Sequence, residues 1–161
     1  MPAAIRAMQA DDTAAIADLT LAAIRQTGLR AYMPAQVAAW AARYNPQRLL
    51  ACAARGDLIL VAVDACDHPL AYIVMEADGH CDMLYCHPDH GGQGLAAALL
   101  AQAERHACAA GLSRLYTEAS ELARPVFARA GFVVLHRRDF AIGPNTAPVT
   151  IHNYAMEKRL I

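Results

Sequence analysis

Long apolar runs, lysines and a large net charge are all scarce in this sequence of 161 residues. Its apolar stretches are interrupted by Pro, Gly, Asn or Gln before they reach the roughly 18–20 residues that a membrane span requires. Lys158 is the one lysine, the 13 arginines are scattered and the formal net charge is −1, so we expect no basic face that neutralises phosphates. These absences predict neither a membrane partner nor a nucleic-acid partner.

Paired cysteines are also lacking. The five cysteines are odd in number, irregularly spaced and without a CxxC pair, which predicts reduced thiols rather than a disulfide framework. Residues 1–6 contain no basic region followed by an apolar core, so no signal peptide is expected. Both observations favour a cytoplasmic protein.

One cluster of potential metal ligands lies within residues 80–90 and consists of His80, Cys81, Cys86, His87 and His90. If residues 80–86 form a strand, alternation places Cys81 on the opposite face from His80 and Cys86. Ligands that point to two faces cannot surround one ion, so we expect no metal site here.

The apolar content is sufficient for one folded domain. Apolar residues make up 57% of the chain, 37 of them alanine, and the net charge is small. Global disorder requires the opposite combination of low hydrophobicity and high charge. We therefore expect residues 1–161 to form a single domain.

The hydrophobic periodicity predicts an alternation of helices and strands. Apolar faces at helical spacing predict helices over residues 12–27, 34–44, 49–55, 92–110 and 120–130. Runs of strand formers between turn signals predict strands over residues 3–8, 58–63, 70–75, 80–86, 115–118, 132–142 and 149–160. The short links between residues 58 and 86 predict an antiparallel meander, and the helical crossover makes 115–118 parallel to 80–86. Trp40 and Tyr44, four residues apart, are expected to be packing residues rather than a substrate wall.

Residues 80–100, HCDMLYCHPDHGGQGLAAALL, predict a strand, a glycine-rich loop and a helix in succession. Gly92, Gly94 and Ala96 have little or no side chain, so a ligand can approach the backbone closely. The first N–H groups of a helix have no internal partner and lie at the positive end of its dipole, a geometry that binds phosphates without a basic side chain.

Two other phosphate-binding motifs share this physics. The P-loop is excluded because the segment contains no lysine. The dinucleotide fingerprint GxGxxA matches residues 92–97, with Glu118 at the end of the next strand, but the further parallel strand–helix units of that fold are missing. A nucleotide-binding oxidoreductase therefore stays open as a less favoured alternative.

From Ile5 to Lys158 the chain resembles the GNAT superfamily of acyl-CoA-dependent N-acetyltransferases. The resemblance is carried by residues 84–100, by TEASELARPVFARAGF at residues 117–132, and by the opening IRAMQADDTAAIADL. It implies an α/β fold of the α+β type: a mixed, mostly antiparallel sheet of six or seven strands with one splayed parallel pair, flanked by about four helices. It also implies acetyl-CoA as the acetyl donor.

The resemblance assigns cofactor contacts to three segments. The pyrophosphate is expected on the amides of the glycine loop and the helix start: Gly92, Gln93, Gly94, Leu95 and Ala96. The pantetheine arm is expected to run beside the third meander strand, against the backbone of Leu84, Tyr85 and Cys86. The second motif supplies Ser120, Arg124 and Phe127.

Two residues depart from the family pattern. Gly91 stands where the pattern [QR]xxGx[GA] has Gln or Arg, so one side-chain contact to the phosphates is lost. Phe127 stands where the family often has a Tyr that protonates the leaving thiolate. A CoA-binding module without catalysis is therefore a second alternative.

The expected reaction is direct attack of a primary amine on the acetyl thioester, with a base that accepts a proton. By period-two alternation His80, Asp82 and Leu84 share one strand face, which the resemblance directs to the reacting centre. Asp82 is the first candidate for the base, His80 the second and Glu118 the third. Tyr154 is a candidate replacement acid.

The identity of the acceptor amine is not encoded in a recognisable motif. The resemblance directs it to residues 28–50 and to the hairpin turn at residues 143–148. Exposed strand edges and an apolar-rich surface favour a homodimer.

Overall fold

A computed structural model describes residues 3–161 of the chain. Its strands are β1 (Ala4–Ala7), β2 (Leu58–Val63), β3 (Pro69–Met75), β4 (Cys81–Cys86), β5 (Arg114–Ala119), β6 (Val133–Ile142) and β7 (Val149–Arg159). Its α-helices are α1 (Thr13–Gln26), α2 (Pro34–Arg43), α3 (Gln47–Arg55), α4 (Leu95–Ala109) and α5 (Arg124–Arg129). Short 3-10 turns lie at Ala10–Asp12, Thr27–Arg30 and Pro88–His90. No helix within residues 3–161 is long and apolar enough to cross a membrane.

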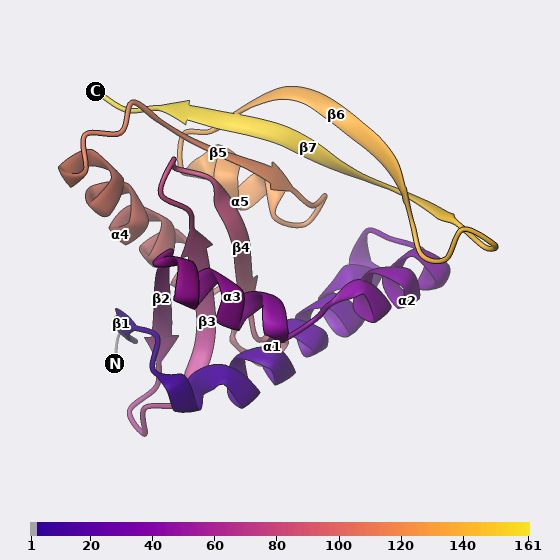
Figure 1. The fold of residues 1–161 in the computed structure, drawn as a ribbon, viewed down its shortest axis with the longest axis horizontal. Coiled ribbons are helices and arrows are strands. Elements are labelled where there is room, and N and C mark those ends of the chain that lie inside the picture. Colours follow the sequence, from indigo (N-terminus) through magenta and orange to yellow (C-terminus); the bar gives the residue numbers. More distant parts are fainter. Residues whose placement is uncertain (1–2) are drawn as a thin grey trace.

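The first sheet has the order β1-β2-β3-β4, with every neighbouring pair antiparallel. It lies between α4 on one face and α1 and α3 on the other (Figure 1). Because both faces are covered, β2 and β3 are nearly continuous apolar runs. Leu60 and Ala62 pack on the α4 side, whereas Ile59 and Val61 pack on the α1 and α3 side. The predicted three-stranded meander, β2 to β4, is confirmed.

The second sheet has the order β5-β7-β6 and is also antiparallel. The long hairpin of β6 and β7 reaches from the top of the molecule towards α2 (Figure 1). The side-chain amide nitrogen Nε2 of Gln36 on α2 donates a hydrogen bond to the backbone carbonyl of Thr150 on β7, at 3.0 Å. This contact ties the tip of the hairpin to the early helices.

The predicted parallel pair is not present as a hydrogen-bonded ladder. Within residues 3–161, one isolated parallel bridge, His80 with Tyr116, connects the start of β4 to β5. Beyond it, side chains of both strands line cavities instead of a continuous sheet. The single central sheet expected from the sequence is therefore divided into two sheets.

Two helix boundaries also differ from the prediction. The helix expected from residue 92 begins at Leu95, because Gly92 and Gly94 have left-handed backbones with φ of 75° and 78°. The helix expected over residues 120–130 is shorter, because residues 120–123 form a turn before α5. All five cysteines are free, and Cys52 and Cys81 are buried.

Candidate active site

Two cavities lie along β4. We call the first the glycine-loop cavity; it has a volume of about 750 Å³ and is lined by β4, the loop at residues 91–94, the start of α4 and residues 120–130. The second, the charged cavity, has a volume of about 390 Å³ and is lined by residues of α2, α3, β4, β5, α5, β6 and β7. Both volumes are in the range of small-molecule sites.

The glycine-loop cavity opens onto the start of α4. Gly94 is the N-cap residue, and no side chain caps the helix there. The first hydrogen bond of the helix runs from the amide of Ala98 to the carbonyl of Gly94, at 3.0 Å. The amides of Leu95 and Ala96 therefore have no intrahelical partner, and both residues line the cavity. Gly92 and Gly94 line it as well, whereas Gln93 is not among the lining residues.

The backbone of β4 presents alternate residues to the gap between the two sheets. The amide of His87 donates to the carbonyl of Leu70 at 2.8 Å, and Tyr85 lies opposite Tyr72 in the same register. Since opposed residues in antiparallel strands alternate between bonded and non-bonded pairs, Leu84 and Cys86 direct their N–H and C=O groups away from β3. Of the three residues predicted beside the cofactor arm, these two have backbone groups free to pair with it, whereas the backbone of Tyr85 pairs with β3.

Trp40 separates the two cavities and lines both of them, as do Leu84, Tyr85, Ser120 and Ala123. Its ring centroid lies 6.4 Å from that of Tyr85 and 5.7 Å from that of Tyr32. Tyr44 lines the charged cavity. As expected, Trp40 and Tyr44 are packing residues: both are partly buried against the small core of Ile24, Tyr32 and Val37, and they line a cavity as well.

Asp82 lies in the charged cavity with its side chain only 8% exposed, and its Oδ1 accepts a hydrogen bond from Nη2 of Arg48 at 2.6 Å. Burial raises the pKa of Asp82 above its ordinary value, and the charges of Arg48 and His80 oppose this rise. A carboxylate with a raised pKa is a better proton acceptor than an ordinary surface aspartate.

A β-bulge re-aims the Asp82 side chain. The register pairs Val74 with Met83 and Met75 with Cys81, which leaves Asp82 unopposed. Cys81 and Leu84 pack on the α4 side of the sheet, whereas Asp82 reaches Arg48 on α3, whose buried face packs on the opposite side. The prediction that Asp82 and Leu84 share a face is therefore wrong, because strict alternation does not hold across a bulge.

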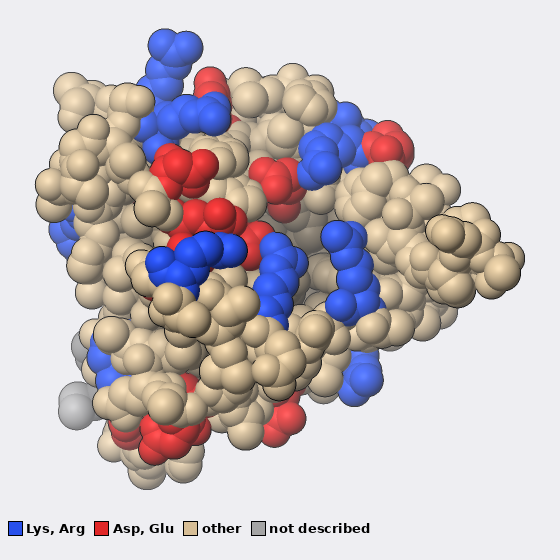
Figure 2. Space-filling view, viewed as in Figure 1, with Lys and Arg blue, Asp and Glu red and all other residues tan. Residues whose placement is uncertain are grey.

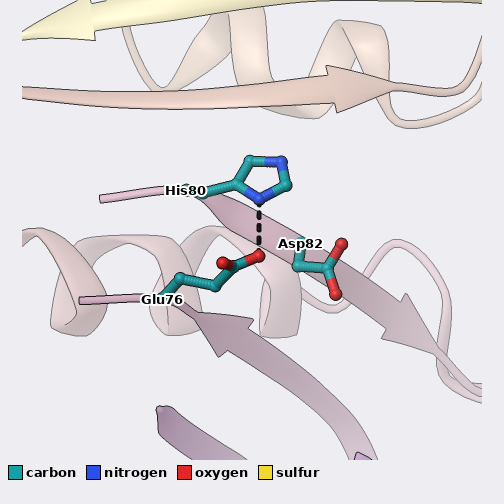
Figure 3. A group of neighbouring side chains, drawn as sticks. All are labelled: Glu76, His80 and Asp82. Atoms are coloured by element: carbon teal, nitrogen blue, oxygen red, sulfur yellow. Dashed lines mark hydrogen bonds and ion pairs between the residues drawn. The ribbon is translucent and has the colours of Figure 1, made fainter. Parts of the chain in front are cut away.

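His80 lies between two carboxylates at the entry to β4. Its Nδ1 is 2.7 Å from Oε1 of Glu76, as Figure 3 shows, and its Nε2 is 3.0 Å from Oε1 of Glu118. Burial by itself lowers the pKa of His80, but the hydrogen bond to Glu76 and the charge of Glu118 outweigh it and raise the pKa above its ordinary value. Its ring also stacks on Tyr116, with centroids 4.8 Å apart. The His80 ring thereby holds Glu118 at the edge of the charged cavity.

The side chains that could share a metal ion differ from the cysteine and histidine cluster at which the sequence analysis expected no metal site. In the described part of the chain, ligand atoms of Glu76, His80 and Asp82 lie within 4.8 Å of one another (Figure 3). Both ring nitrogens of His80 and one oxygen of Asp82 are engaged in the contacts given above. The prediction that Cys81 and Cys86 lie on opposite faces of the strand is also wrong, because the bulge interrupts the alternation and both cysteines pack on the α4 side.

The second-motif residues occupy different environments. Ser120 lines both cavities, and its Oγ accepts a hydrogen bond from the amide of Ala123 at 3.1 Å. Phe127 is 2% exposed, lines the charged cavity and packs edge-on against Phe132. Arg124 lines neither cavity; its Nη2 donates to Oε1 of Glu121 at 2.9 Å.

Tyr154 is held away from both cavities. Its hydroxyl donates to Oε2 of Glu121 at 2.7 Å, and this bond is the main cause of the raised pKa of Tyr154. His152 and Arg124 also bond to Glu121, and the hydrogen bond from His152, followed by those from Tyr154 and Arg124, lowers the pKa of Glu121 to about 2. The phenolic proton of Tyr154 is thus committed to a structural carboxylate.

The sequence analysis did not identify two charged residues that contact His80 and Asp82, namely Glu76 and Arg48. Glu76 flanks the turn opposite His80, and its amide donates to the His80 carbonyl at 2.8 Å, so the short hairpin itself was a signal that these side chains meet. Arg48 carried no such signal, because it reaches Asp82 from a helix 34 residues earlier.

A strand edge beside a helix N-terminus with left-handed glycines, next to a charged cavity, is typical of a group-transfer enzyme with a phosphate-bearing donor. Residues 28–148 match the family model described as acetyltransferase (GNAT) domain. The chain belongs to the GNAT N-acetyltransferase family.

Solved structures agree with this assignment over nearly the whole chain. A GCN5-related N-acetyltransferase from Rhodopseudomonas palustris is 30% identical with a TM-score of 0.85, covering 99% of this chain and 97% of its own. PaiA N-acetyltransferase from Thermoplasma acidophilum, solved with coenzyme A, is 19% identical with a TM-score of 0.77, covering 99% and 100%. A phosphinothricin acetyltransferase from Sinorhizobium meliloti, solved with acetyl-CoA, is 17% identical with a TM-score of 0.73, covering 99% and 89%. A search of curated proteins finds no match.

Proposed function

We propose that the protein transfers the acetyl group of acetyl-CoA to a primary amine by direct attack. The observation that carries the proposal is the junction of the two cavities at Trp40, Leu84 and Tyr85. A donor in the glycine-loop cavity and an amine in the charged cavity would meet there. The crystallisation of two structural neighbours with CoA or acetyl-CoA supports this choice of donor.

The donor is held mainly by the backbone. Amides of the segment Gly92, Gln93, Gly94, Leu95 and Ala96 bind the pyrophosphate, and the left-handed glycines keep side chains out of its way. The free backbone groups of Leu84 and Cys86 pair with the pantetheine arm, and Ser120, which lines both cavities, bounds it on the other side. Phe127 lines the charged cavity and bounds the arm at its acetyl end. The Cys86 amide is also the donor that polarises the thioester carbonyl.

Asp82 accepts the proton of the attacking amine, directly or through water. A primary amine near pKa ~10 arrives mostly protonated, so the base must be ionised and close to the amine. Burial raises the pKa of Asp82 and so makes it a stronger base than usual, while the charge of Arg48 opposes this rise and favours the ionised form. His80 holds Glu118 nearby, and the carboxylate of Glu118 attracts the ammonium group.

Assistance to the leaving thiolate is not expected from the two aromatic positions considered. Phe127 has no proton to donate, and Tyr154 is bonded to Glu121. A thiol with pKa ~8.5 leaves readily near neutral pH, so unassisted departure is adequate.

The test is to incubate the pure protein with acetyl-CoA and a panel of primary amines. Amine-dependent release of free thiol, together with a mass gain of one acetyl group on the amine, is the expected result. CoA binding by calorimetry without thiol release would instead favour the non-catalytic CoA-binding module. Binding of NADPH but not CoA would favour the oxidoreductase alternative.

A further inference from the structure

The charged cavity contains two arginines that have no acidic partner. Arg43 projects from α2 and Arg138 from β6, and both line the cavity. Among residues 3–161, neither guanidinium lies within 4 Å of a carboxylate oxygen. Their neighbours are different: Arg48 is paired with Asp82, and Arg137 is paired with Asp139 at 2.9 Å.

The positive and negative groups of the cavity come from different walls. The acids Asp82 and Glu118 belong to β4 and β5, where the two sheets meet, whereas Arg43 and Arg138 belong to α2 and β6. Figure 2 shows acidic and basic side chains arranged around a hollow in the middle of this face. Arg138 is steadied by the ring of Phe140, 5.6 Å from the guanidinium carbon, and by Asn153, whose Oδ1 is 3.4 Å from Nη1.

The charges within the cavity do not cancel. Arg48 balances Asp82, and His80 lies against Glu118. Of the arginines that line the cavity, Arg43 and Arg138 are then the two whose charge has no acidic partner among residues 3–161. An arginine fork matches the oxygens of a carboxylate or of a phosphorus oxyanion, so the complementary ligand carries such a group.

We infer that the acceptor is a small amine that also carries an anionic oxygen group, either a carboxylate or a phosphorus oxyanion. Its ammonium group faces Asp82 and Glu118, its anionic group contacts Arg43 and Arg138, and its carbon skeleton lies against Trp40. A cavity of about 390 Å³ holds a molecule of this size. The inference rests on the proposed function and narrows its acceptor class.

The test compares acceptors that differ only in the anionic group. The purified protein is assayed with acetyl-CoA and two matched pairs: L-methionine with L-methioninamide, and 3-aminopropylphosphonate with propylamine. The anionic member of at least one pair should have a kcat/KM at least about tenfold higher. For the methionine pair, ionisation works against this result, because the amide's amine loses its proton more easily.

Substitution of the arginines locates the effect. Arg138→Gln and Arg43→Gln should each reduce kcat/KM for the anionic acceptor about tenfold or more, and so reduce its preference over the neutral acceptor. Arg137→Gln is the matched control: it removes the same charge from the neighbouring residue of β6, which pairs with Asp139 and does not line the cavity. It should not alter the preference.

The outcomes separate this inference from the proposed function. Equal or better use of the neutral members, or of a peptide N-terminus, would overturn the inference and leave acetyl transfer intact. An unchanged preference in both Arg43→Gln and Arg138→Gln would overturn it too. Binding of CoA without acetylation of any amine would overturn both proposals.

Discussion

The two cavities of this protein are built from different materials. The glycine-loop cavity presents backbone amides of one continuous segment and the free edge of β4. The charged cavity presents side chains gathered from seven helices and strands. A site made of backbone groups requires a strand, a glycine loop and the start of a helix in succession. A short continuous stretch of sequence is therefore enough to predict it. A side-chain site depends on how remote elements pack.

Asp82→Asn should show the largest difference between the two cavities: it should impair turnover, which depends on the charged cavity, but not CoA binding in the glycine-loop cavity. The variant keeps the shape but cannot accept a proton, so turnover at pH 7 should fall by roughly 100-fold or more, in the range of general base catalysis. CoA affinity, measured by calorimetry, should change less than twofold because the glycine-loop cavity is untouched.

Asp57→Asn is the matched control for Asp82→Asn. Asp57 is also a shielded carboxylate paired with an arginine of α3, Arg55, but it does not line either cavity. Its replacement should leave turnover per folded molecule unchanged. Equal activity of wild type and Asp82→Asn would show that Asp82 is not the base.

Gly94→Val should weaken CoA binding in the glycine-loop cavity. Gly94 and Gly111 lie at opposite ends of α4, have φ of 78° and 77°, and have no neighbour within 4 Å of an added Cβ. Valine at either position should therefore cost a similar backbone strain of about 1–3 kcal/mol. Only Gly94→Val should also raise the Kd for CoA, by about tenfold or more, because it disturbs the amides that bind phosphate. Equal CoA affinities of the two variants would contradict the backbone site.

Arg48→Gln should change the pH dependence of turnover, because Arg48 affects the pKa of Asp82 in the charged cavity. Turnover is expected to fall as pH drops through the pKa of Asp82, because the protonated acid cannot act as a base. Arg48 opposes the rise of that pKa, so its removal should move the acid limb of the kcat profile to higher pH and lower turnover severalfold at mildly acid pH. Arg55→Gln, which removes the partner of Asp57, should leave the profile in place.

Glu121→Gln should have the smallest effect on catalysis and a measurable effect on stability. Glu121 accepts hydrogen bonds from His152, Tyr154 and Arg124, so the variant should lose about 2 kcal/mol of unfolding free energy at pH 7. The folded pKa of about 2 is below the usual value of 4.5, so this stabilisation is complete above about pH 4.5 and is lost as pH falls towards 2. Denaturant titrations should find the two proteins converging in stability over that interval; a constant difference would contradict the assignment.

The sequence predicted the fold where local pattern decides it. The meander follows from short turns between apolar strands, and the loop at Gly92 and Gly94 follows from glycines before an alanine-rich helix. The relation of β4 to β5 was not predictable in the same way, because the whole of α4 lies between these strands in the sequence and they share only the bridge from His80 to Tyr116 among residues 3–161. Trp40 has the spacing of a packing residue, and nothing in its local pattern distinguishes a core from a cavity wall.

The candidate site was predicted in part for the same reason. His80, Asp82 and Glu118 were recognised from their strands, and they lie close to one another. The bulge at Asp82 was not foreseen, because period-two alternation is the only rule that a short strand offers. Arg43, Arg48 and Arg138 come from three separate elements, so their convergence on one cavity becomes visible only in three dimensions.

The most direct test of the central claim is a crystal structure of the protein with CoA. We predict pyrophosphate oxygens within about 2.7–3.2 Å of backbone nitrogens in residues 92–96, with the pantetheine arm paired to Leu84 and Cys86. CoA bound elsewhere, or held at its phosphates by side chains with those amides unoccupied, would contradict the claim.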